Sequence, residues 1–357
     1  MPIQRYGPLS QALTGVAPGT ALRDGLDRIL HADRGALIVL GDGPDVLAIC
    51  SGGFLLDAEF SPQRLAELAK MDGAIILAAD CSRIARANVH LVPDHAIPTS
   101  ETGTRHRTAE RVARLLGVTV LSVSESMSIV TVYLGDQKHY LEVPSRLLTR
   151  ANYALQTLER YRTRLDTVLG RLTALEVEDL VTVRDVVTVL QRIEIVRRIA
   201  LEIEGHVVEL GANGHLVSLQ LQELMSGVLD DCRLVIRDYF NITGGWQVAD
   251  ALAALGALDT EALLDLRQVE SVLRLPGDTS DLDSLLRPRG YRLLGKIPRL
   301  PNAVVQHLVD RFGTIQKILD ASVAELDDVE GVGAARAQAV KEGLTRLTEA
   351  GLLDRWS

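Results

Sequence analysis

The chain has 357 residues, of which 47% are hydrophobic, 24% charged and only 4% aromatic, with a formal net charge of -9. This composition excludes wholesale disorder, and the length predicts two or three domains with aliphatic cores. No apolar run approaches the roughly 18 residues of a membrane span, and the first residues lack the apolar stretch of a signal peptide. We therefore expect a cytoplasmic protein that does not associate with membranes.

The three cysteines, Cys50, Cys81 and Cys232, lie far apart and form no CxxC pair. Their spacing argues against both a disulfide framework and a zinc ribbon. The acidic total also argues against a general polyanion-binding protein, although a net charge can hide a local basic patch. Any contact with nucleic acid is therefore expected from one region of the chain.

Residues 1–143 combine helical and strand patterns. Apolar residues three and four positions apart predict a helix from Leu22 to Leu30, and further helical segments are expected at 62–71 and 107–116. Apolar runs of strand length occur at 36–40, 46–50, 74–79, 118–123 and 129–134. A hairpin turn is expected at 135–137. Together these patterns predict an α/β domain with a mixed central sheet.

After Pro144 the apolar residues recur every three, four or seven positions, and this rhythm continues to about residue 285. It predicts an all-α linker domain over residues 144–286. Residues 287–357 form the third predicted domain, whose first part is locally basic, with helices expected around 301–312 and 334–343. The predicted fold class is therefore α+β, with an α/β domain followed by two helical ones.

The segment Thr104 to Thr108 reads Thr-Arg-His-Arg-Thr at the expected start of a helix. Arginines at a helix N-terminus oppose the macrodipole, at roughly 0.3–1 kcal/mol each. Free backbone N–H groups, Arg105, His106, Arg107 and two threonine hydroxyls would form an anion site there. The alternative is a solvated helix start whose arginines pair with acids, and the residues alone leave both readings open.

Asp72 and Gly73 directly precede the strand expected at 74–79. An Asp-Gly pair is ordinary turn chemistry, yet a carboxylate in this place could also hold a divalent metal or accept a proton from a hydroxyl. Ser124 and Glu125 follow the strand expected at 118–123 and offer a hydroxyl and a carboxylate for phosphate or metal. On its own, this Ser-Glu element is a weak signal.

Two nucleotide-binding motifs are excluded. Gly41 and Gly43 begin a dinucleotide fingerprint, but Val46 stands where its third glycine would fall, and no GxxxxGK[ST] sequence occurs. The histidines outside the Thr104–Thr108 segment show no metal-ligand spacing.

A tight turn ending in Gly331-Val332-Gly333 precedes the last predicted helix. Such a turn points successive N–H groups outward, where a DNA phosphate can accept them. The segment 297–301 resembles a degenerate copy of this hairpin that lacks the Gly-x-Gly. The alternative is a pair of helical hairpins that only pack together. The residues predicted to contact DNA are Lys296, Arg299, Gly331, Gly333 and Arg336.

These motifs, in this order and at this length, resemble the bacterial DNA integrity scanning proteins, a family of diadenylate cyclases. The resemblance covers nearly the whole chain: the Asp-Gly-Ala and Arg-His-Arg motifs, a helical linker and a terminal helix-hairpin-helix domain. It implies condensation of two ATP molecules into cyclic di-AMP and two pyrophosphates with Mg²⁺ or Mn²⁺. It also implies an octamer with face-to-face cyclase domains, binding of branched or junction DNA in damage signalling, and association with the nucleoid.

The resemblance gives each motif a role. It implies that Asp72 is catalytic, and that Asp72 and Glu125 bind the metal. The residues implied to bind ATP are Gly73, Leu91, Thr104, Arg105, His106, Arg107, Thr108 and Ser124. A rival interpretation is a DNA-binding scaffold whose nucleotide domain senses ATP without cyclising it; the presence of Asp72 favours the enzyme.

Overall fold

The structure is a computed structural model, which describes residues 7–240, 247–273 and 281–353. It divides into two compact units. The sheet unit contains residues 1–154 and 202–220, and the helical unit contains residues 155–201 and 221–357. The predicted boundaries at 143/144 and 286/287 stay predictions, and small parts of all three predicted domains (1–6, 241–246, 274–280 and 354–357) lie outside the described residues.

The sheet unit contains a mixed sheet, as the sequence predicts. Its strand order is β2-β5-β4-β1-β6-β7-β8, and β3 pairs with β5 off this path. The pair β1–β4 is parallel, whereas β1–β6, β4–β5, β6–β7 and β7–β8 are antiparallel. The strands are β1 (Ala36–Leu40), β2 (Cys50–Ser51), β3 (Phe54–Glu59), β4 (Ala74–Leu77), β5 (Arg83–Leu91), β6 (Thr119–Ser124), β7 (Ile129–Leu134) and β8 (Gln137–Tyr140).

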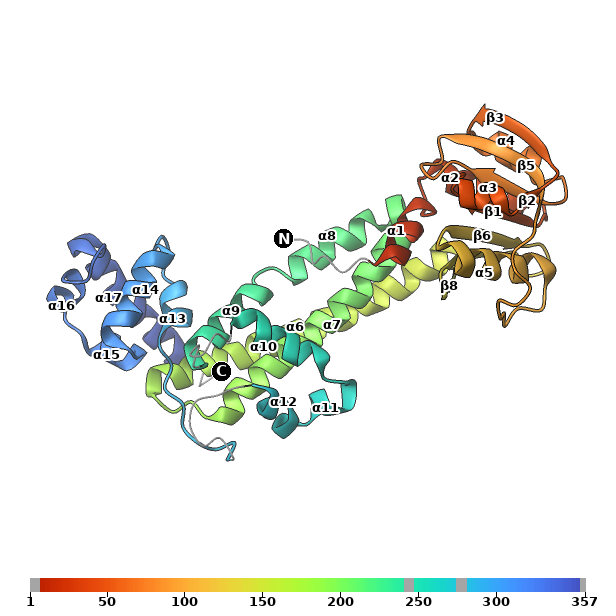
Figure 1. The fold of residues 1–357 in the computed structure, drawn as a ribbon. Helices are drawn as coiled ribbons and strands as arrows, with labels where there is room; N and C mark the ends of the chain where they lie inside the picture. Colours follow the sequence, from red (N-terminus) through yellow and green to blue (C-terminus); the bar gives the residue numbers. More distant parts are fainter. Residues whose placement is uncertain (1–6, 241–246, 274–280, 354–357) are drawn as a thin grey trace. The chain divides into compact units, whose positions relative to one another are not determined.

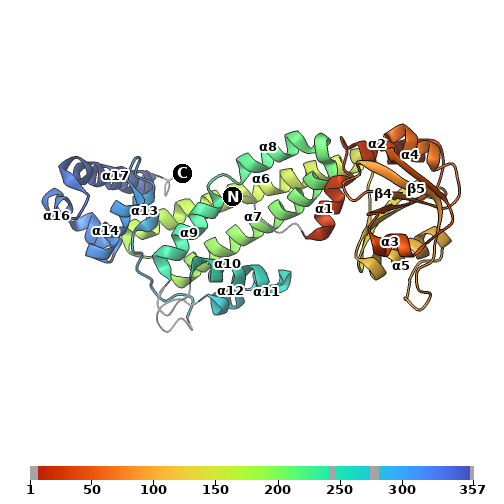
Figure 2. The ribbon, with the colours of Figure 1, turned by 45° about the horizontal axis from the view of Figure 1, so that its top comes forward.

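Helices cover both faces of this sheet (Figures 1 and 2). They are α1 (Pro8–Gly15), α2 (Ala21–His31), α3 (Pro44–Ala48), α4 (Pro62–Leu68) and α5 (Thr104–Leu116). Because successive strand residues point to opposite faces, Ile38 packs with α2 and α4 in one core. Its neighbours Leu37 and Val39 pack with α3 and α5 in the other core.

One predicted strand is wrong, and the strands β2, β3 and β5 were not predicted. Residues 46–50 lie mostly in α3, because Pro44 supplies a preorganised first helical residue after Gly43. The strands β3 and β5 escaped prediction because they are not continuous apolar runs: β3 is largely exposed, and β5 alternates charged and apolar residues. The hairpin turn between β7 and β8 is confirmed.

The helical linker is confirmed as helical. Its elements are α6 (Pro144–Glu178), α7 (Val183–Leu210), η1 (Gly211–Gly214), α8 (His215–Leu224), α9 (Val228–Tyr239), α10 (Val248–Ala257), α11 (Thr260–Leu264) and α12 (Leu266–Val272). Leu165, Leu169 and Leu172 lie on one stripe of α6 and are buried, as their spacing predicts. No helix in the described part of the chain is long and apolar enough to cross a membrane.

The last five helices share a core of their own within the helical unit (Figure 1, blue). They are α13 (Tyr291–Gly295), α14 (Asn302–Phe312), α15 (Ile315–Asp320), α16 (Val323–Asp327) and α17 (Gly333–Leu353). Ser322 and Glu325 form a capping box that fixes the start of α16. Ile297 and Val329 are both buried in the shared core.

Candidate active site and candidate DNA-binding hairpins

The register of the sheet gathers the sequence motifs at one edge. Leu37 of β1 lies opposite Ala74 of β4, and Ala36 of β1 lies opposite Val123 of β6. The residues just beyond these pairs are Asp72-Gly73 before β4, Gly35 before β1 and Ser124 at the end of β6. Motifs more than fifty residues apart in the sequence therefore meet where β1 and β4 begin.

Asp72 and Arg105 form the centre of this edge. The Arg105 Nη2 lies 3.8 Å from the Asp72 Oδ1. The Asp72 side chain is fully exposed and that of Arg105 is 41% exposed. An exposed pair at this distance contributes little to stability, so the fold does not depend on it.

Two glycines at this edge allow close contacts that a larger residue would block. Gly73 has φ +98, and a Cβ on it would lie 2.8 Å from the backbone carbon of Asn88, so only glycine fits. A Cβ on Gly35 would lie 2.2 Å from the Arg105 Nη1, so the guanidinium rests on this residue. Gly35 was not predicted as a site residue, because no local sequence pattern marks it before the register of β1 is known.

The helix α5 begins at this edge with its first turn uncapped. Gly103 is its N-cap and provides no side-chain hydrogen bond, and the first turn contains no acid. Thr104 and Arg107 are exposed, and Thr108 is partly buried. Free N–H groups and two arginines therefore surround the start of α5, an arrangement that could bind an anion, while the anion site itself stays a prediction.

His106 differs from its neighbours because a partly buried chain of hydrogen bonds holds its side chain. Its Nδ1 lies 2.9 Å from the Tyr133 hydroxyl, which donates to the Glu101 Oε1 at 2.9 Å. Lys138 forms an ion pair with the same carboxylate. Burial lowers the pKa of His106 below its usual value. Glu101, Tyr133 and Lys138 were not predicted, because they come from a loop and two strands that only the fold brings together.

The remaining predicted nucleotide contacts lie at or near the same edge. Leu91 ends β5 there, but its side chain is buried in the core, so only its backbone can face a ligand. The Ser124 Oγ lies 3.4 Å from the Ser126 Oγ and accepts from the Met127 N–H at the same distance. Glu125 is exposed.

The described residues contain no group of three or more histidine, cysteine, aspartate or glutamate side chains placed to hold a metal ion. A divalent cation here would therefore rely on Asp72, with Glu125 as the second predicted ligand. This donor set fits Mg²⁺, which takes one or two carboxylates and completes its shell with substrate phosphates and water.

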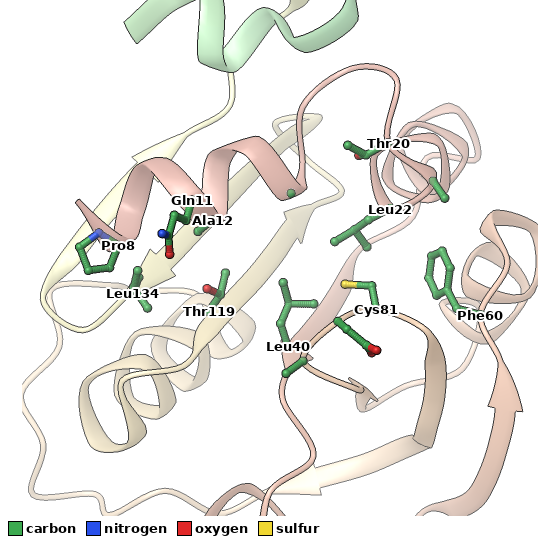
Figure 3. A pocket seen from close by; sticks show the side chains of 14 residues that line it. Pro8, Gln11, Ala12, Thr20, Leu22, Leu40, Phe60, Cys81, Thr119 and Leu134 are labelled. Atoms are coloured by element: carbon green, nitrogen blue, oxygen red, sulfur yellow. The ribbon is translucent and has the colours of Figure 1, made fainter. Parts of the chain in front are cut away.

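A cavity of about 650 Å³ lies at the opposite edge of the sheet. Leu40, Thr119 and Leu134 line it where β1 and β7 end and β6 begins, together with Gln11 and other α1 residues (Figure 3). None of the predicted site residues lines this cavity.

The two C-terminal hairpins share one turn geometry. The Val332 N–H donates to the Val329 carbonyl at 3.0 Å, and the Leu300 N–H donates to the Ile297 carbonyl at 3.4 Å. Gly331 has φ +80, and Arg299 occupies the equivalent place with φ +62. The upstream segment is thus a second copy of the turn, in which an arginine takes a left-handed conformation that usually favours glycine.

The predicted DNA-contacting residues separate into two groups. Arg336 is exposed and its Nη1 donates to the Gly331 carbonyl at 2.7 Å, which places a charge beside the hairpin backbone. The Lys296 ammonium instead donates to the Thr173 Oγ1 of α6 at 3.0 Å. Burial, and next the charge of Arg292, lower the pKa of Lys296.

Comparison with known proteins agrees with this architecture. Residues 23–138 match the family model described as DisA bacterial checkpoint controller nucleotide-binding, and residues 141–282 match that of the DisA bacterial checkpoint controller linker region. The DNA integrity scanning protein DisA of Acidothermus cellulolyticus is 56% identical, covering 98% of this chain and 95% of the relative. The protein of that name from Kineococcus radiotolerans is 57% identical, with 98% and 97% covered.

The chain belongs to the DisA family. Asp72, Leu91, Arg105 and Ser124 all fall within the range matched by the DisA nucleotide-binding model. The paired hairpins at Arg299 and Gly331 follow the range matched by the DisA linker model.

Proposed function

We propose that this DisA family member is a diadenylate cyclase, a nucleotidyltransferase that condenses two ATP molecules into cyclic di-AMP and two pyrophosphates. The observation that carries the proposal is the meeting of Asp72 with Arg105 beside the uncapped start of α5. A carboxylate, two arginines and free N–H groups at one exposed edge are the groups that phosphoryl transfer from a triphosphate requires.

In this proposal the basic residues bind the triphosphate and the acidic residues bind the metal ion. Arg105 and Arg107 bind the triphosphate and stabilise the pyrophosphate as it leaves, because guanidinium groups match phosphate oxygens in bidentate pairs. The first-turn N–H groups of α5 add donors. Asp72, with Glu125, would hold the Mg²⁺ or Mn²⁺, which supplies charge neutralisation at the α-phosphate when bound. Gly73, the residue after Asp72, lets the chain pass close to the backbone of β5 at Asn88.

The product joins two nucleotides, whereas each sheet unit contains one set of motifs. Two sheet units must therefore present their edges to each other, each with one ATP. This requirement supports a homo-oligomer with face-to-face cyclase units, for which we propose an octamer.

Replacing Gly35 by alanine should weaken catalysis without unfolding the protein. The new methyl group would occupy the space of the Arg105 guanidinium, and a flexible side-chain end can move away. We expect turnover to fall by about 10-fold, roughly the loss of one charged hydrogen bond, with no change in melting temperature beyond a few degrees. Gly43→Ala is the matched control, because a Cβ there meets nothing within 4 Å. Unchanged turnover in Gly35→Ala would show that catalysis does not depend on the position of the Arg105 guanidinium against Gly35.

We also propose that the paired hairpins bind branched or junction DNA and so couple the enzyme to DNA-damage signalling at the nucleoid. Gly331, Gly333 and Arg299 shape the two turns, whose backbones can approach phosphates closely. Arg336 adds charge beside one of them. Several such domains on one oligomer would engage separate DNA arms by multivalency.

Removing the Arg336 charge should weaken binding to junction DNA by a similar factor for every sequence. Contacts of this kind are made to phosphate, so the slope of log affinity against log salt should fall by about 1 in Arg336→Ala. Arg346→Ala is the control, because it removes the same exposed charge from the same helix ten residues away. Equal affinity losses in both variants, measured by fluorescence anisotropy, would contradict the assignment.

The rival function is a DNA-binding scaffold whose sheet unit senses ATP without cyclising it. Both functions predict ATP binding at the Asp72 edge. Only the cyclase predicts pyrophosphate release and a cyclic dinucleotide, so product analysis separates them.

A further inference from the structure

The cavity at the edge of the sheet opposite Asp72 has the size and the wall of a small-molecule site. Its volume of about 650 Å³ lies within the range of roughly 300–1,000 Å³ that such sites occupy. Its wall is mostly apolar, and several elements of the sheet unit contribute to it (Figure 3). The larger apolar side chains of the wall are Pro8, Leu22, Leu40, Phe60 and Leu134.

One wall of the cavity is held in place by the turn at η1. Gly15 and Thr20 line the cavity, and the loop between them docks on this turn. The Ala212 N–H donates to the Pro18 carbonyl at 2.9 Å, and a Cβ on Gly19 would lie 2.8 Å from the Ala212 Cβ. Contacts this close fix the loop without any ligand, so the cavity is preformed, as small-molecule sites usually are.

Three polar side chains of the wall have no hydrogen-bond partner among the residues that the structure describes. They are the Gln11 amide, the Thr119 hydroxyl and the Cys81 thiol. Cys81 has φ +56, a backbone conformation that residues other than glycine adopt only occasionally. Figure 3 shows its sulfur directed toward Leu22 and Leu40. A ligand in the cavity would therefore meet polar groups that are free to bind it.

Asp80 gives the cavity its charge. Among the 14 described residues that line the cavity, it is the one charged side chain, and none is lysine, arginine or histidine. Its Oδ1 accepts from the Ser82 N–H at 3.0 Å and from the Ser82 hydroxyl at 2.6 Å, which orients the carboxylate. No described group donates to Oδ2. An anionic ligand would meet a like charge here, whereas an ammonium group would find an acceptor.

We propose that this cavity is a second ligand site, which binds a small molecule with an apolar body and a cationic amino group. Asp80 binds the ammonium at the rim. The apolar body lies against Leu22, Leu40 and Phe60, where its burial supplies most of the affinity. Nucleotides do not bind there, because their phosphates would meet Asp80 and no basic side chain of the wall.

The cavity and the Asp72 edge are opposite ends of the same strands. Leu40 ends β1 at the cavity and pairs with Thr119, which begins β6 there. At the other ends of these strands, Ala36 pairs with Val123, the residue before Ser124. The ligand should therefore bind without displacing ATP. The inference does not rest on the proposed cyclase function, and its tests need no turnover.

Three probes with one naphthyl ring and different charges test the chemical class of the ligand. They are naphthylethylamine, naphthylethanol and naphthylpropanoate, titrated into the full-length protein and followed by ligand-observed NMR. The amine should bind with a Kd on the order of 1 mM or tighter, as expected for a ligand of this size. The alcohol should bind about 5-fold more weakly, and the propanoate most weakly. Tighter binding of the propanoate, or no binding of the amine, would overturn the proposal.

Asp80→Asn tests the assigned carboxylate and retains an oxygen that can accept from Ser82. The amine should then bind only as tightly as the alcohol, whose affinity should not change. Asp45→Asn is the matched control, because it removes an exposed carboxylate that does not line the cavity. In Ala12→Trp, the indole should fill the cavity and abolish binding of both probes. An undiminished preference for the amine in Asp80→Asn would contradict the role of Asp80.

Alkylation of Cys81 by iodoacetamide shows whether the amine binds in this cavity. Cys50 is the internal reference, because it is also partly exposed but does not line the cavity. With naphthylethylamine at ten times its Kd, alkylation of Cys81 should slow by about 10-fold, while that of Cys50 should not change. Mass spectrometry of the peptides gives both rates. Equal rates with and without the amine would overturn the proposal, and so would a Cys81 that reacts only after denaturation.

Discussion

Asp72→Asn is expected to lower cyclic dinucleotide formation by about 100- to 1000-fold, the usual loss for one essential transition-state contact. The substitution removes the carboxylate charge and keeps the volume of the side chain. ATP binding measured by calorimetry should change much less, because Arg105, Arg107 and the start of α5 remain. Since Asp72 is fully exposed and its pair with Arg105 is 3.8 Å long, the melting temperature should not change.

Asp136→Asn is the matched control for this experiment. Asp136 is also exposed and forms a comparable pair with an arginine, with its Oδ1 3.1 Å from the Arg114 Nε. It lies in the β7–β8 turn, at the other end of the sheet from Asp72. Its variant should retain full turnover. Wild-type turnover in Asp72→Asn would remove Asp72 from the mechanism.

The largest expected effect on stability comes from Arg292, a buried residue in the helical unit. Its side chain is 1% exposed, and it donates from Nη2 to the Glu176 Oε2 at 2.5 Å and from Nε to the Glu176 Oε1 at 2.9 Å. The Tyr239 hydroxyl donates to the same carboxylate at 2.7 Å. These bonds join α13 and α9 to α6. Arg292→Met should lower the free energy of unfolding of this unit by about 3–5 kcal/mol, because it leaves a buried carboxylate without its cation.

Two further variants identify the cause of this loss. Arg233→Met removes an exposed arginine paired with Asp230 and should change stability by no more than about 0.5 kcal/mol. The double variant Arg292→Met with Glu176→Leu should recover much of the loss, since neither charge is then buried alone. Urea denaturation of the full chain, followed by hydrogen exchange in peptides from α6 and α13, gives these values. A loss below about 1 kcal/mol in Arg292→Met would show that the pair is not a structural requirement.

Local sequence patterns were sufficient for the parts of the fold that depend on local physics. Residues 36–40 and 129–134 form β1 and β7 as predicted, because continuous apolar runs mark strands that are buried on both faces. The run at 46–50 has the same composition but follows Pro44, and the local start of a helix outweighed its β-branched residues. The strand β5 alternates polar and apolar residues and contains three arginine or histidine side chains, so no apolar run marks it.

Only those residues of the candidate site that belong to a recognisable sequence motif could be predicted. Asp72 and Arg105 stand in recognisable motifs, whereas Gly35 gains its meaning from the register of β1 against β6. Tyr133 and Glu101 reach His106 from segments that no local pattern links to it. Lys296 was predicted to contact DNA because it lies in a basic stretch of the sequence. In the structure its ammonium donates a hydrogen bond to Thr173 of α6, which no local pattern indicates.

The most direct test of the central claim is to incubate the purified full-length protein with ATP and Mg²⁺ and to identify the products by mass spectrometry. We expect cyclic di-AMP with two pyrophosphates for each product molecule, and about 100- to 1000-fold less of both from Asp72→Asn. ATP that is bound and recovered unchanged, or hydrolysed to ADP or AMP without a cyclic dinucleotide, would contradict the claim.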